Sequence, residues 1–188
     1  MDTTADKARV VASAPEAARR LAPGAPPMIV QSLCQSLFAA ELMAPGDAVW
    51  IAVRRIYNVA LLDNSAHAFR HLEPNWPQGR VRMLSVLEKL MGDGVSIRIL
   101  TEAHQSNKVF ANEFGGLSHG NESSSLRMLE DWGGLAGGIA GSSFYLEGGL
   151  QCSRASGLTV AERELLLFID GDAIDRGQQR LAEVWEKG

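Results

Sequence analysis

The chain has 188 residues, of which 46% are hydrophobic and 21% charged, and 18 Lys and Arg against 22 Asp and Glu give a formal charge of −4. This size predicts one domain and leaves no room for a second full one. The acidic balance excludes a broadly cationic nucleic-acid binder, so any nucleic-acid partner must meet a local basic patch.

Cysteine usage and hydropathy indicate a cytoplasmic protein. The two cysteines, Cys34 and Cys152, lie in unrelated segments without metal-binding spacing, which argues against a zinc module and against a disulfide scaffold. No apolar stretch approaches about 18 residues, and the first residues mix acids with bases, so we expect neither membrane insertion nor secretion. We also expect no metal and no cofactor.

The first 27 residues are rich in Ala and Pro, and we expect a flexible arm there because proline interrupts helices. The globular domain is expected to span 28–188. It begins with a helix, because apolar residues recur at helical spacing from Met28 to Leu42 until Pro45 and Gly46 stop the run. The continuous apolar run at 48–53 then predicts a strand covered on both faces.

The middle of the chain predicts a βαβ unit. Residues 54–79 show no clear hydrophobic period and are expected to form a long loop that covers another part of the domain. Apolar spacing over 83–91 predicts an amphipathic helix, and 95–100 predicts the next strand. A strand, a helix and a strand in this order favour parallel strands with a right-handed crossover, so the predicted fold class is α/β.

The last third of the chain predicts a short helix, a meander of strands and a final helix. The short helix is expected at 104–114, and the final helix is expected to start with Asp172 as its N-cap. Between them, strands separated by Gly and Ser turns are expected at 125–129, 134–141, 143–150 and 164–170.

Standard nucleophile and phosphate-loop motifs are absent from this sequence. The four histidines lack a partner at metal-binding spacing, so solvent-exposed side chains are the simplest interpretation for His67, His71, His104 and His119. The small residues of 141–150 allow two interpretations. Their backbone N–H groups could hold a phosphate, or the glycines could serve only to let two strands pack closely.

From residue 28 onward the chain resembles the phospholipase D-like superfamily in its compact bacterial form. The segments that carry the resemblance are Gly46–Ile51, Leu61–Asn64, Val86–Leu90, Gly94–Thr101 and Leu181–Trp185. The resemblance implies a mixed sheet flanked by helices, a homodimer, and a site built from a His-x-Lys motif, a Gly-Ser-x-Asn turn and a later Glu.

The most specific motif of that family is degenerate in this chain. The resemblance places Glu130 at the histidine, Trp132 at the lysine and Phe144 at the asparagine. The Gly-Ser pair is kept at Gly141 and Ser142, and Glu164 stands at the later glutamate. A carboxylate in place of the nucleophile repels a phosphodiester, so the resemblance implies a fold without its catalytic chemistry.

Three hypotheses follow. The first is a catalytically degenerate subunit of a bacterial phage-defence or DNA-restriction system, which binds other proteins of that system or a nucleic-acid backbone, with DNA as a candidate. The former active-site cleft is the expected binding surface, and its expected residues are Arg54, Arg55, Trp132, Gly141, Ser142 and Ser143. For the two arginines, a solvated strand end is an equally good interpretation.

The second hypothesis is an active metal-independent phosphodiesterase or nuclease whose histidine has moved to His104 or His119. The third is an interaction subunit whose cleft is filled by Trp132 and Phe144 and binds nothing.

Overall fold

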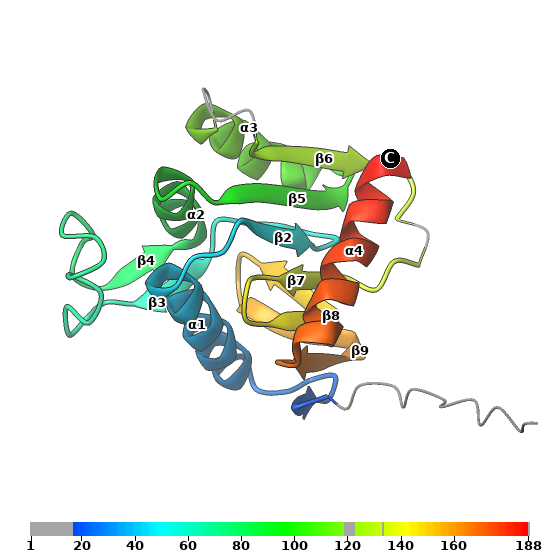
Figure 1. Cartoon of the computed structure of the whole chain (residues 1–188), viewed down its shortest axis with the longest axis horizontal. Helices are drawn as coiled ribbons and strands as arrows, with labels where there is room; N and C mark the ends of the chain where they lie inside the picture. The colour runs from blue at the N-terminus through cyan, green and yellow to red at the C-terminus, as the bar shows by residue number, and fades with distance from the viewer. Residues whose placement is uncertain (1–16, 119–122, 133, 188) are drawn as a thin grey trace, which may run out of the picture.

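The computed structural model describes residues 17–118, 123–132 and 134–187 (Figure 1). Its helices are α1 (Pro27–Met43), α2 (Met83–Gly92), the single 3-10 turn η1 (Gln105–Asn107), α3 (Lys108–Leu117) and α4 (Gly171–Lys187). Its strands are β1 (Arg19–Leu21), β2 (Ala48–Ala52), β3 (Ala60–Asp63), β4 (Arg80–Arg82), β5 (Ser96–Glu102), β6 (Ser125–Leu129), β7 (Gly138–Ala140), β8 (Tyr145–Ser153) and β9 (Gly157–Phe168).

Within the described residues, seven strands form one mixed sheet in the order β1-β9-β8-β7-β2-β5-β6, and β3 and β4 form a separate hairpin. β2 is parallel to β5, and β5 is parallel to β6. On its other side β2 is antiparallel to β7, and β7, β8 and β9 form an antiparallel meander. The expected meander also included 125–129, but that segment is β6, which lies at the far edge of the sheet and is parallel to β5. The predicted α/β class and the flanked mixed sheet are confirmed.

Helices cover both faces of this sheet (Figure 1). The apolar residues of α1, α2 and α3 join the larger hydrophobic cluster, and those of α4 join a smaller cluster on the opposite face. Trp185 anchors the end of α4, because the guanidinium groups of Arg98 and Arg127 lie 5.4 and 4.4 Å from its ring. The N-cap prediction was wrong by two residues: Asp170, and not Asp172, accepts the N–H of Ala173, at 3.2 Å.

Two segments expected to be irregular contain strands. Arg19–Leu21 pairs with Leu165–Leu167 as an antiparallel edge strand, so the end of the expected arm belongs to the sheet. Residues 1–16 lie outside the described part of the chain. The expected loop at 54–79 contains β3, which pairs with β4 directly after it. Both pairings join short strands to partners that no local pattern identifies.

The buried amide of Asn64 closes the segment between β3 and β4. Its Nδ2 donates to the Pro77 carbonyl at 3.0 Å, and its Oδ1 accepts the N–H of Phe69 at 3.0 Å. The side chain is fully buried. Asn64 therefore satisfies backbone groups that no strand partner reaches, and its place in the Leu61–Asn64 segment has a structural explanation.

The Gly141–Phe144 turn lies at the amino end of β2, away from the strand ends where the site was expected. β7 runs antiparallel to β2, with Gly138 opposite Ala52 and Ala140 opposite Trp50, so the chain reaches Gly141 while moving toward the start of β2.

A buried carboxylate fixes that turn. Glu41 Oε2 accepts the N–H and the hydroxyl of Ser142 at 2.8 and 2.9 Å, and its Oε1 accepts the N–H of Gly46 at 3.0 Å. A Cβ on Gly141 would lie 2.5 Å from Glu41 Oε2. The Gly-Ser pair therefore lets a turn pack on α1.

Phe144 belongs to the core, where it has no exposed surface and its ring lies 6.3 Å from that of Phe38 in an edge-to-face arrangement. We predict that Phe144→Ala lowers the free energy of unfolding by about 3–5 kcal/mol, because it removes apolar contacts and leaves a cavity. Urea denaturation measures this. Ile169→Ala, at a side chain that is 64% exposed, is the control and should change it by less than about 0.5 kcal/mol. Equal effects of the two variants would contradict the assignment.

The two cysteines lie within the larger hydrophobic cluster, one on α1 and one on β8. Burial raises the pKa of the Cys34 thiol from 9.0 to about 12, and the neighbouring Cys152 adds to the shift. Burial likewise raises the pKa of Cys152 to about 12, against a smaller lowering by a hydrogen bond with the backbone of Tyr57.

These shifts predict a loss of stability in alkali. A thiol whose pKa is higher in the folded state stabilises the fold fully below its unfolded pKa, and this contribution is lost as the pH rises toward the folded pKa. We therefore expect the free energy of unfolding to fall between about pH 9 and about pH 12. The Cys34→Ala/Cys152→Ala variant should show a shallower decline in the same urea titrations, and an unchanged decline would refute this explanation.

Candidate functional site

The carboxyl ends of β2 and β5 lie side by side, because these strands are parallel neighbours, and the buried side chain of Asn107 joins them. Its Nδ2 donates to the carbonyl oxygens of Arg54 and Glu102 at 3.0 and 2.8 Å and to the Thr101 hydroxyl at 2.7 Å. Its Oδ1 accepts the N–H of Ile56 at 3.0 Å. One amide therefore fixes the backbone on both sides of the strand ends.

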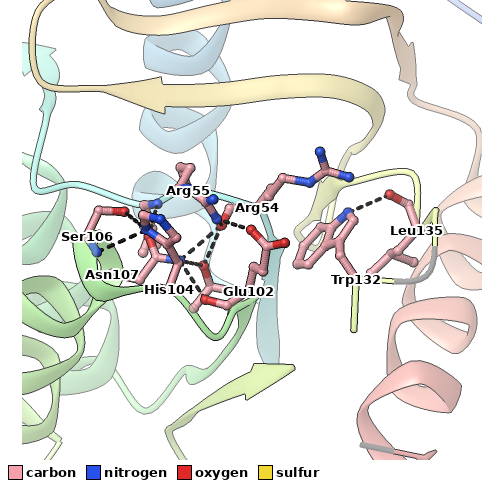
Figure 2. Close-up of polar contacts among 10 residues, drawn as sticks. Arg54, Arg55, Glu102, His104, Ser106, Asn107, Trp132 and Leu135 are labelled. Atoms are coloured by element: carbon pink, nitrogen blue, oxygen red, sulfur yellow. Dashed lines mark hydrogen bonds and ion pairs between the residues drawn. The ribbon is translucent and has the colours of Figure 1, made fainter. Parts of the chain in front are cut away.

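The two arginines that follow β2 point in different directions (Figure 2). Arg55 forms an ion pair with Glu102 at the end of β5. Arg54 extends toward Trp132, and its guanidinium makes no hydrogen bond or ion pair with the described part of the chain. The sequence offered no distinction between the two, but the structure leaves Arg54 available to a ligand and engages Arg55 internally.

Arg54 lines a small pocket, which we call the strand-end pocket. Its walls come from the end of β2, the segment before β7, and the β8–β9 hairpin, and its lining residues are Arg54, Trp132, Gly134–Gly137, Gly148–Gln151 and Ala161–Arg163. Its volume is about 60 Å³, well below the roughly 300 Å³ at which small-molecule pockets begin. The pocket therefore fits a phosphate-sized group and excludes a nucleobase.

The backbone around the strand-end pocket is unusually tight. The pairing of β8 with β9 shifts register between Gly148 and Leu150. A Cβ on Gly149 would lie 2.0 Å from the Ala161 carbonyl oxygen, so only glycine permits this approach. Glu162, one of the extra β9 residues at this register shift, has a φ of 64°, a conformation rare for residues other than glycine. Close packing of strands explains these glycines, and it shapes the pocket.

None of the three described histidines, His67, His71 and His104, is among the described residues that line the strand-end pocket. His104 is exposed at the start of η1, where its Nδ1 accepts the N–H of Ser106 at 3.1 Å and lies 2.8 Å from the Ser106 hydroxyl. The N–H of Ser106 thus occupies the Nδ1 lone pair of His104. His119 lies outside the described residues.

The structure brings together only some of the residues expected in the cleft. Trp132 does reach the strand-end pocket, but it is 6% exposed and its Nε1 donates to the Leu135 carbonyl at 2.8 Å, so it forms a packed wall. Glu130 is exposed just after β6, and Glu164 forms a surface ion pair with Arg20 at 3.7 Å.

The expected convergence of Ser142, Ser143 and Phe144 with Arg54 was wrong, because the turn that holds them lies at the opposite end of β2. The sequence did not point to Arg163 and Glu162, which line the pocket, or to Asn107, which holds the backbone of Arg54. The unusual glycine density of 133–149 was the only sequence signal near this place, and it did not indicate which side chains would face the glycines.

Among the described residues, no helix is long and apolar enough to cross a membrane. In the same part of the chain, no three or more His, Cys, Asp or Glu side chains are grouped so that they could hold a metal ion.

No protein-family model matches the chain, and no curated protein matches it. Solved structures do resemble it. One is Nuc from Salmonella typhimurium, a phospholipase D family member, with a TM-score of 0.53 and 9% identity over 82% of this chain and 88% of that chain. Another is NucT from Helicobacter pylori, with a TM-score of 0.51 and 9% identity over 89% of this chain and 94% of that one.

A third similar structure is TrmBL2, an archaeal chromatin protein described as showing a novel mode of DNA binding. It has a TM-score of 0.51 and 11% identity, and the match covers 95% of this chain but only 55% of that chain. This chain therefore spans about half of TrmBL2. At such low identity these likenesses concern the fold, and they support the expected phospholipase D-like fold.

Proposed function

We propose that the chain binds the sugar-phosphate backbone of a nucleic acid at the strand-end pocket and does not cleave it. The observation that carries this proposal is that Arg54 and Arg163 line one phosphate-sized pocket and, within the described residues, neither guanidinium has an ion-pair partner. Guanidinium groups match phosphate oxygens in geometry and charge. Glu162 supplies one carboxylate against these two cations.

The lining of the pocket supports binding without cleavage. Phosphodiester transfer through a covalent intermediate needs a nucleophile and a general acid. Of the described residues that line the pocket, none is His, Lys, Ser, Thr, Cys or Tyr. Glu162 is the lining carboxylate, and its charge repels the phosphate that it would have to attack. A degenerate phospholipase D-like domain accounts for this combination.

We also propose an oligomeric state and a cellular role for the chain. The chain acts as a cytoplasmic homodimer within a bacterial phage-defence or DNA-restriction system, where it binds other proteins of that system. The resemblance of the sequence to compact phospholipase D-like proteins supports this setting. The likeness in fold to a DNA-binding chromatin protein supports DNA as the nucleic acid.

We predict that Arg54→Ala/Arg163→Ala weakens binding to single-stranded DNA roughly tenfold or more, because each arginine donates charge-assisted hydrogen bonds to phosphate. Fluorescence anisotropy at several salt concentrations measures the affinity. The slope of log K against log salt should fall by about 0.7 for each phosphate group that the variant no longer binds. Arg19→Ala, an exposed arginine on β1, is the control for net charge. Equal weakening in both variants would remove the strand-end pocket from consideration.

We further predict that the purified chain, with EDTA present, hydrolyses neither bis-(p-nitrophenyl) phosphate nor single-stranded DNA, and that it sediments as a dimer of the 20.3 kDa chain. Reproducible cleavage would favour the alternative, an active phosphodiesterase with a relocated histidine. His104→Ala and His119→Ala would then identify the nucleophile, because only the variant that lacks it loses activity. A monomer at equilibrium would contradict the proposed dimer.

A further inference from the structure

A second and much larger cavity lies between the N-terminal turns of α1, the β3–β4 hairpin, α3 and the tip of the β8–β9 hairpin. We call it the hairpin groove. Its volume is about 970 Å³, at the upper end of the roughly 300–1,000 Å³ of ligand pockets, so it can receive groups that the strand-end pocket excludes. The function proposed above makes no use of this groove.

The charge of the hairpin groove is locally positive on a chain whose overall charge is −4. Arg80, Arg82 and Arg154 line it, against the carboxylates of Asp63 and Glu113. Arg82 donates to the carbonyl oxygen of Asn58 at 2.9 Å, and within the described residues neither Arg82 nor Arg154 forms an ion pair with a carboxylate. Their positive charges are therefore available to an anion.

An aromatic platform accompanies these charges. The Arg154 guanidinium lies over the ring of Tyr57, 5.7 Å from its centre, and Arg154 itself is exposed. Unpaired nucleobases stack on aromatic rings and on the planar guanidinium groups of arginines. The hairpin groove thus offers both contacts that single-stranded nucleic acids use, cations for the backbone and a planar group for a base.

The hairpin groove and the strand-end pocket both lie along β8. β8 runs in the direction of β2, because each is antiparallel to β7, and Glu147 lies opposite Gly138 at the level of Ala52. Residues that follow Glu147 therefore extend beyond the carboxyl end of β2. Gln151 lines the strand-end pocket and Ser153 lines the hairpin groove, and two residues of a strand span only about 7 Å.

We propose that the hairpin groove holds the single-stranded nucleic acid that continues from the phosphate in the strand-end pocket, with Arg82 and Arg154 on its backbone or bases. This inference rests on the proposed function and adds to it the path of the strand and the preference for unpaired nucleic acid.

The length of the oligonucleotide distinguishes binding at the strand-end pocket alone from binding at both sites. Anisotropy titrations would use labelled oligothymidine and oligouridine of about 4 and about 12 nucleotides, lengths that bracket a short and an extended binding site. The wild type should bind the longer strands more tightly. Arg82→Ala/Arg154→Ala should leave the short strands unaffected, remove most of the extra affinity for long strands, and lower the salt slope for the long strands by about 0.7 for each phosphate no longer bound. The two oligonucleotide types distinguish DNA from RNA.

Two controls keep the outcomes distinct. Arg19→Ala reports the effect of removing a charge outside both sites, and thermal unfolding of every variant reports folding. If Arg54→Ala/Arg163→Ala loses affinity for both lengths while Arg82→Ala/Arg154→Ala matches the wild type, the inference about the groove is overturned and the proposed function stands. If the wild type binds no oligonucleotide, both fail, and the groove is left to a protein partner.

Discussion

The side chain of Asn107 is the constraint on which the geometry of the candidate site depends. Its four hydrogen bonds hold the backbone of Arg54 and Ile56 against the end of β5 in a buried setting, where an unpaired polar group would cost about 1–3 kcal/mol. Because the backbone direction is fixed there, the consecutive residues Arg54 and Arg55 must point apart. Arg55 forms an ion pair with Glu102, and Arg54 reaches the strand-end pocket.

The β8–β9 hairpin organises the remaining features. Its bulge on β9, opposite Gly149, brings Ala161–Arg163 into the lining of the strand-end pocket, and its tip carries Arg154 into the hairpin groove. The rare backbone conformation of Glu162 lies at this bulge, and such conformations persist where the surrounding structure imposes them. The same hairpin thus separates a site for one phosphate from a site for the groups that follow it.

Elements with a strong local pattern were predictable, and placements that depend on distant pairing were not. The apolar spacing in α1 and α2 and the apolar runs of β2 and β5 predicted nearly the observed bounds of those elements. The phospholipase D-like fold was implied by the resemblance of the chain from residue 28 onward to that superfamily. The Gly141-Ser142 motif was misleading because a two-residue pattern does not reveal which end of a sheet its turn occupies, which depends on the pairing of β7 with β2. Arg163 was missed because its face depends on the extra residues that β9 carries where its pairing with β8 shifts register.

The short strand β1 has a consequence for how copies of this chain meet. It covers the edge of β9 at Leu165–Leu167, an apolar run whose backbone N–H and C=O groups would otherwise be open to solvent. Open, apolar strand edges recruit further strands and lead to aggregation. A shortened chain that begins at α1 would keep both pockets but lose this protection. Self-association of such a fragment would then report a bare sheet edge and carry no information about the native oligomer.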